Sequence, residues 1–416
     1  MKFKKGWTLA LAGAMGFVAS AIQAQGLTLD EAVRRSLADN AALRAEGAAV
    51  AAVRHQAAAD GLAPPLTIGT EVENVAGTGD VSGIHGAETT LRLGRVFELG
   101  GKQSARRALG EAQVARQLNL VEQRRLDVAA DVAYRFIEVV SKQARLALAE
   151  QALTLAQASR KAVAQRVERG RSPQADLHLA DLAVIRAELE REAAGNELAS
   201  ARVTLSVLWG QQQPDFERAS GELEALPAIA PFEALVERLP RSPDQQAFAL
   251  ETQQIAAQTR VAEASRKPDL QTTLGVRRLE AIDDQALVLS FSLPLGMSAR
   301  SSSAIAKQQA EGERVEAQRS VTALDAYQSL FGRYQSLQRA RHEFETMRER
   351  MIPIAEKALA STEAGYEEAR FSFLQVAQAR TVLLGLQRDV IDAATRYHRL
   401  LADIERATAV SGDLNP

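Results

Sequence analysis

Few side chains in this 416-residue sequence could perform chemistry, and their spacing favours no catalytic or metal site. No two of the five histidines stand at a metal-ligand spacing: His55, His85, His178, His342 and His398. There is no cysteine, which excludes disulfides, thiolate metal sites and a cysteine-borne lipid anchor. A nucleophile elbow, a phosphate-binding loop, an HExxH motif and paired catalytic carboxylates are also missing from the sequence. We therefore expect neither enzymatic activity nor a cofactor.

Two weaker groupings remain. Glu71 and Glu73 could join His85 in an oxygen-and-imidazole metal site, and His178 stands close to Asp176. Charges in such positions are more often part of a wet surface, and we favour that interpretation for both groups.

Long helices must position most of these residues. Lys102–Trp209 reads as two helices joined at Glu168–Pro173, because Gly170 can end one helix and Pro173 can begin the next. No proline and only one glycine lie between Gly101 and Gly170, so the first helix would be roughly 100 Å long. The second carries an apolar residue every three or four positions from Leu177 to Leu208, broken only at Arg191. This spacing predicts a heptad seam between paired helices.

The same pattern recurs in the second half of the chain. The seam that begins at Leu177 begins again at Val376, and Arg300–Ala409 repeats the pair of helices. Leu29–Val33 is echoed by Phe232–Val236. These matches predict an internal duplication. We expect a first repeat (25–210), a linker (211–230), a second repeat (231–410) and a short tail (411–416).

The beginning of the sequence indicates export. Three lysines precede an apolar run in Met1–Ala24, which is typical of a secretory signal cleaved after Ala21 or, as we favour, after Ala24. Beyond it, no apolar run is long enough for a transmembrane helix. The formal net charge of −2 argues against nucleic acid as a partner.

Before each long hairpin, the sequence predicts a helix and two strands. We expect the first helix to run from Leu29, capped by Thr28, to Asp60. Apolar and polar residues then alternate in four segments, around Leu66–Glu73, Thr90–Phe97, Leu270–Val276 and Leu287–Leu293. A half-buried sheet in a soluble domain would show the same alternation. If the strands enter a membrane, four are too few to close a barrel, and several chains must share one.

The chain resembles the TolC family of outer-membrane efflux channels over nearly all of its mature length. That family has duplicated hairpins whose tips carry Tyr-x-x-Gly, followed six residues later by an acidic residue. Here the tips read Val167–Gly170 with Asp176, and Tyr366–Ala369 with Gln375. Val167, Ala369 and Gln375 depart from the pattern. Three shorter motifs resemble the CzcC-type branch, which serves heavy-metal exporters: Glu71–Asn74, Glu98–Lys102 and Leu293–Leu295.

The resemblance implies a mainly α protein with a membrane β-barrel. Three chains would form a periplasmic α-barrel of twelve helices and share a barrel of twelve strands in the outer-membrane lipid. A periplasmic adaptor protein would link this homotrimer to an inner-membrane pump of the RND type. The expected function is a passive export duct for heavy-metal cations. A drug or protein export channel of the same family, and a periplasmic coiled-coil adaptor or structural protein, remain alternatives.

The resemblance also suggests functional positions at the tips. We expect Asp176 to form a charged ring at the periplasmic entrance, with Gln375 and Gln378 at the corresponding level of the second repeat. An equally good interpretation is that Asp176 only stabilises the first turn of its helix. The tips that should contact the adaptor are Gly170, Arg171, Ser172, Ala369, Arg370 and Phe371.

Overall fold

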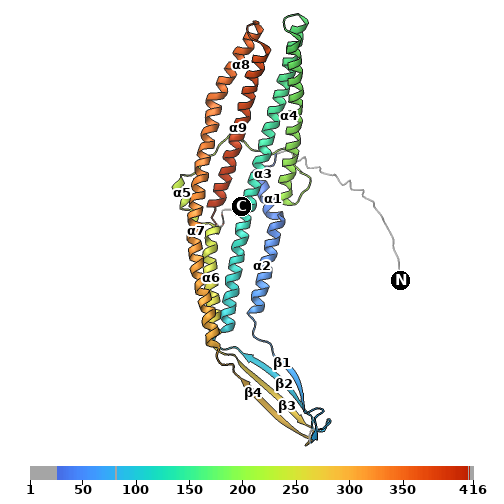
Figure 1. Ribbon diagram of the computed structural model, residues 1–416, viewed down its shortest axis with the longest axis vertical. Helices are drawn as coiled ribbons and strands as arrows, with labels where there is room; N and C mark the ends of the chain where they lie inside the picture. The colour runs from blue at the N-terminus through green and yellow to red at the C-terminus, as the bar shows by residue number, and fades with distance from the viewer. Residues whose placement is uncertain (1–25, 80–81, 411, 413–416) are drawn as a thin grey trace, which may run out of the picture.

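The computed structural model describes residues 26–79, 82–410 and 412, so the predicted signal (1–24) and most of the tail (411–416) lie outside the described residues. Long helices and one four-stranded sheet form an elongated molecule (Figure 1). The helices are α1 Leu29–Asp39, α2 Ala41–Asp60, α3 Lys102–Glu168, α4 Gln174–Ser206, α5 Phe232–Val236, α6 Pro243–Ala264, α7 Met297–Thr346, α8 Ile352–Glu367 and α9 Phe373–Thr408. The strands are β1 Thr67–Glu73, β2 Glu88–Phe97, β3 Leu270–Leu279 and β4 Asp284–Ser292. Short 3-10 turns, η2 Val207–Trp209 and η3 Leu239–Arg241, and the π-helical turn η4 Met347–Met351 complete the list.

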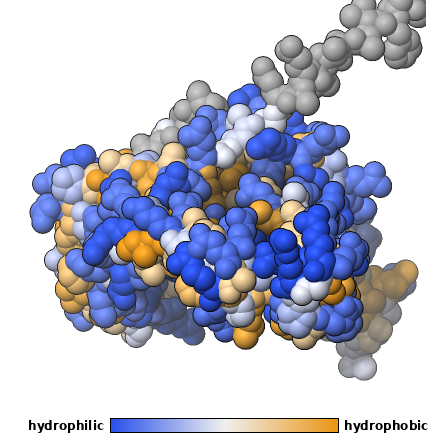
Figure 2. Space-filling view, turned by 90° about the horizontal axis from the view of Figure 1, so that it is seen from above, coloured by the Kyte–Doolittle hydropathy of each residue, from blue (hydrophilic) through white to orange (hydrophobic). Residues whose placement is uncertain are grey.

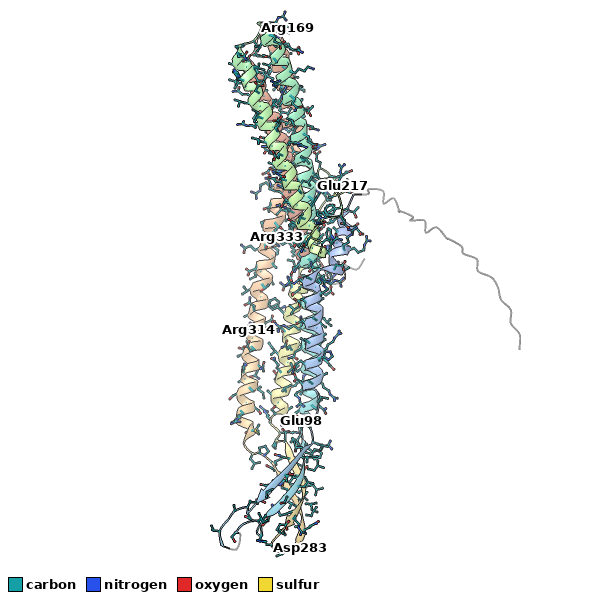
Figure 3. All side chains as sticks on the ribbon, turned by 90° about the vertical axis from the view of Figure 1, so that its right-hand side faces the viewer. Glu98, Arg169, Glu217, Asp283, Arg314 and Arg333 are labelled. Carbon is teal, nitrogen blue, oxygen red and sulfur yellow. The ribbon has the colours of Figure 1, made fainter. Side chains whose placement is uncertain are left out.

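The tips of the two helical hairpins and the sheet lie at opposite ends of the molecule. Figure 3 places Arg169, at the α3–α4 turn, at one end and Asp283, at the β3–β4 turn, at the other. The predicted fold class, mainly helical with four antiparallel strands per chain, is confirmed.

The predicted seam of the first hairpin is also confirmed. Helix α3 runs unbroken for 67 residues, because its interior contains no proline. Helix α4 packs against it through five buried seam residues, Ala180, Ala187, Leu198, Ala201 and Leu205, whereas Arg191 is exposed. Small and branched residues at these positions let the two helix backbones approach closely.

The expectation of a single helix over Leu29–Asp60 is wrong. Asn40 adopts an extended conformation between α1 and α2, with ψ of 128°. Its side-chain oxygen accepts hydrogen bonds from the backbone N–H groups of Ala42 (2.9 Å) and Leu43 (3.4 Å) and thereby caps α2. Its amide nitrogen donates to the carbonyl of Leu208 at 2.9 Å. Asparagine is a strong N-cap, so a new helix start is stabilised here although no glycine or proline marks it.

The second hairpin is built less regularly than the first. Between α7 and α8 the helix widens to the π-helical turn Met347–Met351, and Pro353 lies in the first turn of α8. Proline has no N–H to donate to the preceding turn, which explains why the hydrogen-bond pattern changes just before it.

The main core lies midway along the molecule, where α1, α3, α4 and α9 meet the linker. Phe136 and Val132 of α3, Ala394 of α9 and Trp209 are buried there. Ala219 of the linker (211–230) is buried in this core. It pairs with Leu27, near the start of the described chain, as an isolated parallel β-bridge. This pairing ties the start of the described chain to the middle of the helical body, far from the sheet (Figure 1).

The sheet has the order β1-β2-β3-β4, and every neighbouring pair is antiparallel. One face of the sheet carries apolar side chains, and these are exposed to solvent in the single chain. The exposed fraction is 79% for Ile68, 73% for Leu287 and 64% for Phe291. Leu93, Leu274 and Leu289 share this face, because Leu93 is paired with Leu274 and Leu274 with Leu289. The predicted alternation of the strands is therefore confirmed.

Among the described residues, no helix has the length and apolar character needed to cross a membrane.

Candidate functional site at the helix tips and the polar face of the sheet

The two hairpin tips have the same backbone design. In the first tip, Gly170 has φ of 68° and the Arg171 N–H donates to the Arg166 carbonyl at 2.8 Å. In the second, Ala369 has φ of 60° and the Arg370 N–H donates to the Gly365 carbonyl at 2.7 Å. A left-handed alanine costs roughly 1–2 kcal/mol relative to a glycine, so the second tip holds its turn against local strain.

Aromatic and small side chains pack the tips against one another. Val163 of α3, Ala180 of α4 and Phe373 of α9 are buried together. The Arg166 guanidinium lies over the Tyr366 ring, 4.5 Å from its centroid, and the Tyr366 hydroxyl is 3.3 Å from the Ser172 hydroxyl. Tyr366 therefore connects the two hairpins. Figure 2, seen from the tip end, shows a largely hydrophilic surface with scattered hydrophobic patches.

The expected adaptor-contact residues lie at these tips with different surroundings. Arg171 and Arg370 are exposed, and Ser172 is half-buried against Tyr366. Phe371 is 43% exposed, yet its ring lies so close to Gly365 that a Cβ there would stand 2.2 Å from ring atom Cδ2. One face of the Phe371 ring is thus packed and the rest is available to a partner.

The expected gate residues occupy the first turns of α4 and α9. Asp176 is half-buried in the first turn of α4, and its N–H donates to the Pro173 carbonyl at 3.1 Å. The Gln375 side-chain oxygen accepts from the Ser372 N–H at 2.9 Å, which completes a capping box at the start of α9. Gln378, one turn further on, is exposed. Gln375 and Gln378 are both exposed and Asp176 is half-buried, but the side chain of Gln375 is engaged in capping.

Arg380 is a tip residue that the sequence reasoning missed. Its Nη1 donates to the Ser159 hydroxyl of α3 at 2.8 Å, and its Nη2 donates to Glu363 of α8 at 2.8 Å. Only 18% of its side chain is exposed. Ser159 lies 221 positions earlier, so no local pattern indicated this contact. The sequence offered one signal for a buried contact: this arginine directly follows the seam residue Ala379.

The polar face of the sheet is lined by charged pairs that cross strands. Glu71 pairs with Arg92. Arg277 of β3 forms ion pairs with Glu73 of β1 at 2.7 Å and Glu88 of β2 at 2.6 Å. Among the described residues, no group of three or more histidines, aspartates and glutamates is placed to hold a metal ion. Glu71 and Glu73, considered above with His85, are each bonded to an arginine instead.

A charged groove of about 370 Å³ lies between α3, α4 and α9. Glu138 pairs there with Arg399 and with Lys142, and Lys142 also bonds Glu197 at 2.8 Å. The Tyr134 hydroxyl donates to Asp403, and its burial, with this bond, raises the pKa of Tyr134. Glu138 and Glu197 are thus each paired with a cation from a different helix.

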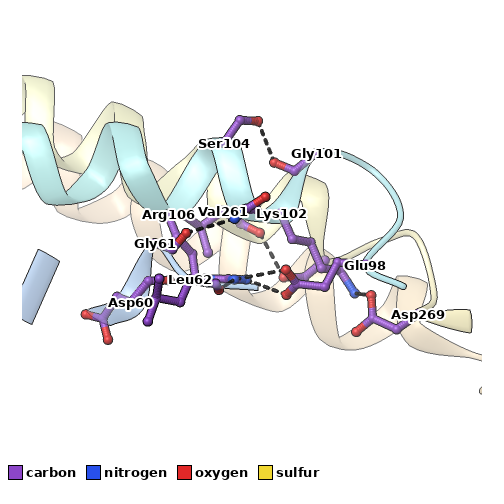
Figure 4. Close-up of polar contacts among 12 residues, drawn as sticks. Asp60, Gly61, Leu62, Glu98, Gly101, Lys102, Ser104, Arg106, Val261 and Asp269 are labelled. Atoms are coloured by element: carbon purple, nitrogen blue, oxygen red, sulfur yellow. Dashed lines mark hydrogen bonds and ion pairs between the residues drawn. The ribbon is translucent and has the colours of Figure 1, made fainter. Parts of the chain in front are cut away.

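The junction between helices and sheet is fixed by one arginine (Figure 4). Arg106 of α3 binds Glu98, at the end of β2, through Nη1 at 2.5 Å and Nη2 at 2.9 Å. The same side chain donates to the carbonyls of Asp60 (2.5 Å) and Leu62 (2.8 Å), where α2 ends. Beside it Lys102 bonds Asp269, which precedes β3, at 2.6 Å. Helix α3, the end of α2 and the sheet are thereby held together.

A family model described as "Outer membrane efflux protein" matches residues 32–211. Cobalt-zinc-cadmium resistance protein CzcC of Cupriavidus metallidurans is 29% identical over 322 residues, which are 75% of this chain and 77% of the relative. Nickel-cobalt-cadmium resistance protein NccC of Alcaligenes xylosoxydans xylosoxydans is 28% identical over 210 residues, 50% of this chain and 47% of the relative.

Solved structures share the fold. The open state of the MtrE outer membrane channel of Neisseria gonorrhoeae superposes with a TM-score of 0.74 at 15% identity. The match covers 92% of this chain and 89% of that one, so both the sheet and the hairpins have counterparts there.

Proposed function

Because this chain belongs to the outer membrane efflux protein family, the TolC family, we propose that three copies of it assemble into one export duct. The observation that carries the proposal is the incomplete sheet. Its outer strands β1 and β4 each have a free edge, and its apolar face is exposed. Backbone groups at a free edge cannot remain unpaired in lipid. Three copies joined edge to edge give twelve strands, above the roughly eight needed to close a membrane barrel.

The helices support the same assembly. Leu179, Leu182, Ile185 and Leu189 form an exposed stripe on α4, with exposed fractions from 43% to 63%. A stripe of large apolar side chains near a hairpin end indicates a neighbouring helix. The chain would consist of two repeats, 25–210 and 231–410, joined by the linker 211–230. In a trimer of such chains, each hairpin would lie beside a hairpin of another repeat, which could cover this stripe.

We propose divalent heavy-metal cations as the cargo and an RND-type pump with a periplasmic adaptor as the partners. The cargo is suggested by the names of the two metal-resistance relatives. The partners follow from the resemblance of the hairpin tips, and the adaptor would bind Gly170–Ser172 and Ala369–Phe371. Energy would come from the pump, because the channel itself is passive.

Two experiments test assembly and cargo separately. Crosslinking in native outer membranes should yield a trimer, and recovery of only monomer or of soluble periplasmic protein would reject the duct. A strain lacking this gene should become sensitive to cobalt, zinc or cadmium salts and recover on complementation. Unchanged metal tolerance together with increased sensitivity to drugs, or with a loss of protein export, would replace the metal cargo by one of the two alternatives.

A further inference from the structure

The Arg277 side chain spans three strands of the sheet on its polar face. Its Nη2 contacts Glu73 of β1 at 2.7 Å, its Nη1 contacts Glu88 of β2 at 2.6 Å, and its Nε donates to the Thr90 hydroxyl at 3.0 Å. Asn74 donates to the other oxygen of Glu88 at 3.1 Å. The guanidinium is thus bonded on three sides, and Thr90 beneath it is fully buried.

The two carboxylates are an unusual pair for neighbouring strands. Glu73 and Glu88 stand directly opposite one another in the β1–β2 register. Like charges in that position repel and destabilise the sheet unless a counter-ion lies between them. Two carboxylates with a hydroxyl oxygen nearby are also a set of oxygen ligands that hard and borderline divalent cations prefer. Arg277 occupies the place between these carboxylates.

We propose that Arg277 is an internal counter-ion that lets divalent cations pass this end of the barrel without being retained by Glu73 and Glu88. A fixed guanidinium satisfies both carboxylates with directed hydrogen bonds, so a passing cation would have to displace a covalently attached competitor. Gly275 lets β2 and β3 approach closely beside Thr90, since a Cβ there would lie 2.8 Å from the Leu91 carbonyl oxygen and 3.2 Å from Thr90 Cγ2.

The net charge of the polar face depends strongly on Arg277. Asp284 of β4 stands in the same row as Glu73 and Glu88, because Glu88 is paired with Leu279 and Leu279 with Asp284. With Glu71 this face carries four carboxylates against Arg92 and Arg277, which leaves two net negative charges per chain. Without Arg277 the face would carry three, so the acidic ring of a trimer would become half as negative again. Acidic rings concentrate cations and strengthen their binding in a pore. This inference rests on the proposed function, because the face lines a pore only in the closed trimer.

The test is conductance of the purified full-length channel in planar bilayers, with potassium chloride as the current carrier and Cd²⁺ as the added divalent cation. Arg277→Gln should be blocked at a Cd²⁺ concentration at least about tenfold lower than the wild type, because a two-carboxylate oxygen site becomes free. The double variant Glu73→Gln/Arg277→Gln should return to near the wild-type sensitivity. Arg278→Gln is the matched control, because Arg278 points to the opposite face and pairs with Asp283.

Equal Cd²⁺ sensitivity of Arg277→Gln and the wild type overturns the inference, as does persistence of the stronger block in the double variant. If Arg277→Gln fails to form channels, the double variant should still form them, because it also removes the repulsion. Failure of both to assemble would make Arg277 purely structural and overturn the inference. A wild-type protein that forms no channel at all would instead refute the proposed function.

Discussion

Leu289 on β4 offers a direct test of which face of the sheet contacts lipid. It is 58% exposed in the single chain and stands opposite Leu274 of β3. Strand β4 has nine residues, which at about 3.3 Å per residue make a strand of roughly 30 Å. With a tilt of about 40° the strand spans ~23 Å of membrane depth, close to the ~25 Å apolar band of such barrels. We therefore expect Leu289 to lie near the bilayer midplane.

Replacing Leu289 with arginine should cost ~2–4 kcal/mol per chain, the cost of a cation on the lipid face at the midplane, and roughly three times that per trimer. Two matched controls lie on the same chain. Ser290→Arg places the same charge on the polar face, and Leu293→Arg places it just after the strand, where the cost should be only ~0–1 kcal/mol.

The assay is urea unfolding of the protein refolded into lipid vesicles, combined with heat dissociation of the trimer during electrophoresis. The expected order of destabilisation is Leu289→Arg well above Ser290→Arg and Leu293→Arg. If Ser290→Arg were the most damaging, the face assignment would be reversed, because a shift of one residue exchanges the two faces of a strand. Equal tolerance of all three variants would mean that the sheet is not in lipid.

Three further predictions concern the helical part. Asp176→Asn should lower the cation selectivity of bilayer conductance if the carboxylate faces the duct; a change confined to thermal stability, of ~0.3–1 kcal/mol, would leave only its role in the first turn of α4. Photocrosslinkers at Arg171 and Phe371 should capture the adaptor, whereas capture only from the loop 77–86 at the opposite end would reverse the proposed orientation. Burial lowers the pKa of His398, so the folded state favours the neutral ring; its contribution to stability should be complete above about pH 6.5 and decline as the pH falls. His398→Gln, which keeps a donor for the Leu223 carbonyl, should flatten the fall in melting temperature on acidification, and an unchanged pH profile would contradict this reasoning.

Local sequence information was sufficient for most elements of the fold. The absence of proline between Gly101 and Gly170 predicted the uninterrupted helix α3, and the seam spacing after Leu177 predicted which side of α4 is buried. The alternation in 287–293 predicted the apolar face of β4. These features depend on periodicity and on backbone stereochemistry, which act over a few residues and can be read directly from their order.

The break at Asn40 shows where such reasoning reaches its limit. An asparagine after an aspartate is a permissible helix interior as well as a cap, and periodicity alone does not choose between them. The tertiary structure decides, because the Asn40 amide donates to the Leu208 carbonyl across 168 positions of sequence. A contact made only in the folded chain therefore stabilises the break.

The sequence by itself thus predicted most of the helices and the alternation of the strands, because these follow from local spacing. Only the tertiary structure decided which charged residues meet. Arg277 and Glu88 are separated by 189 positions, and Arg380 and Ser159 by 221, so their pairing depends on how the two halves of the chain lie beside each other. An arginine side chain bonds whichever oxygens come within about 3 Å, and that distance is set by packing between distant segments and not by sequence spacing.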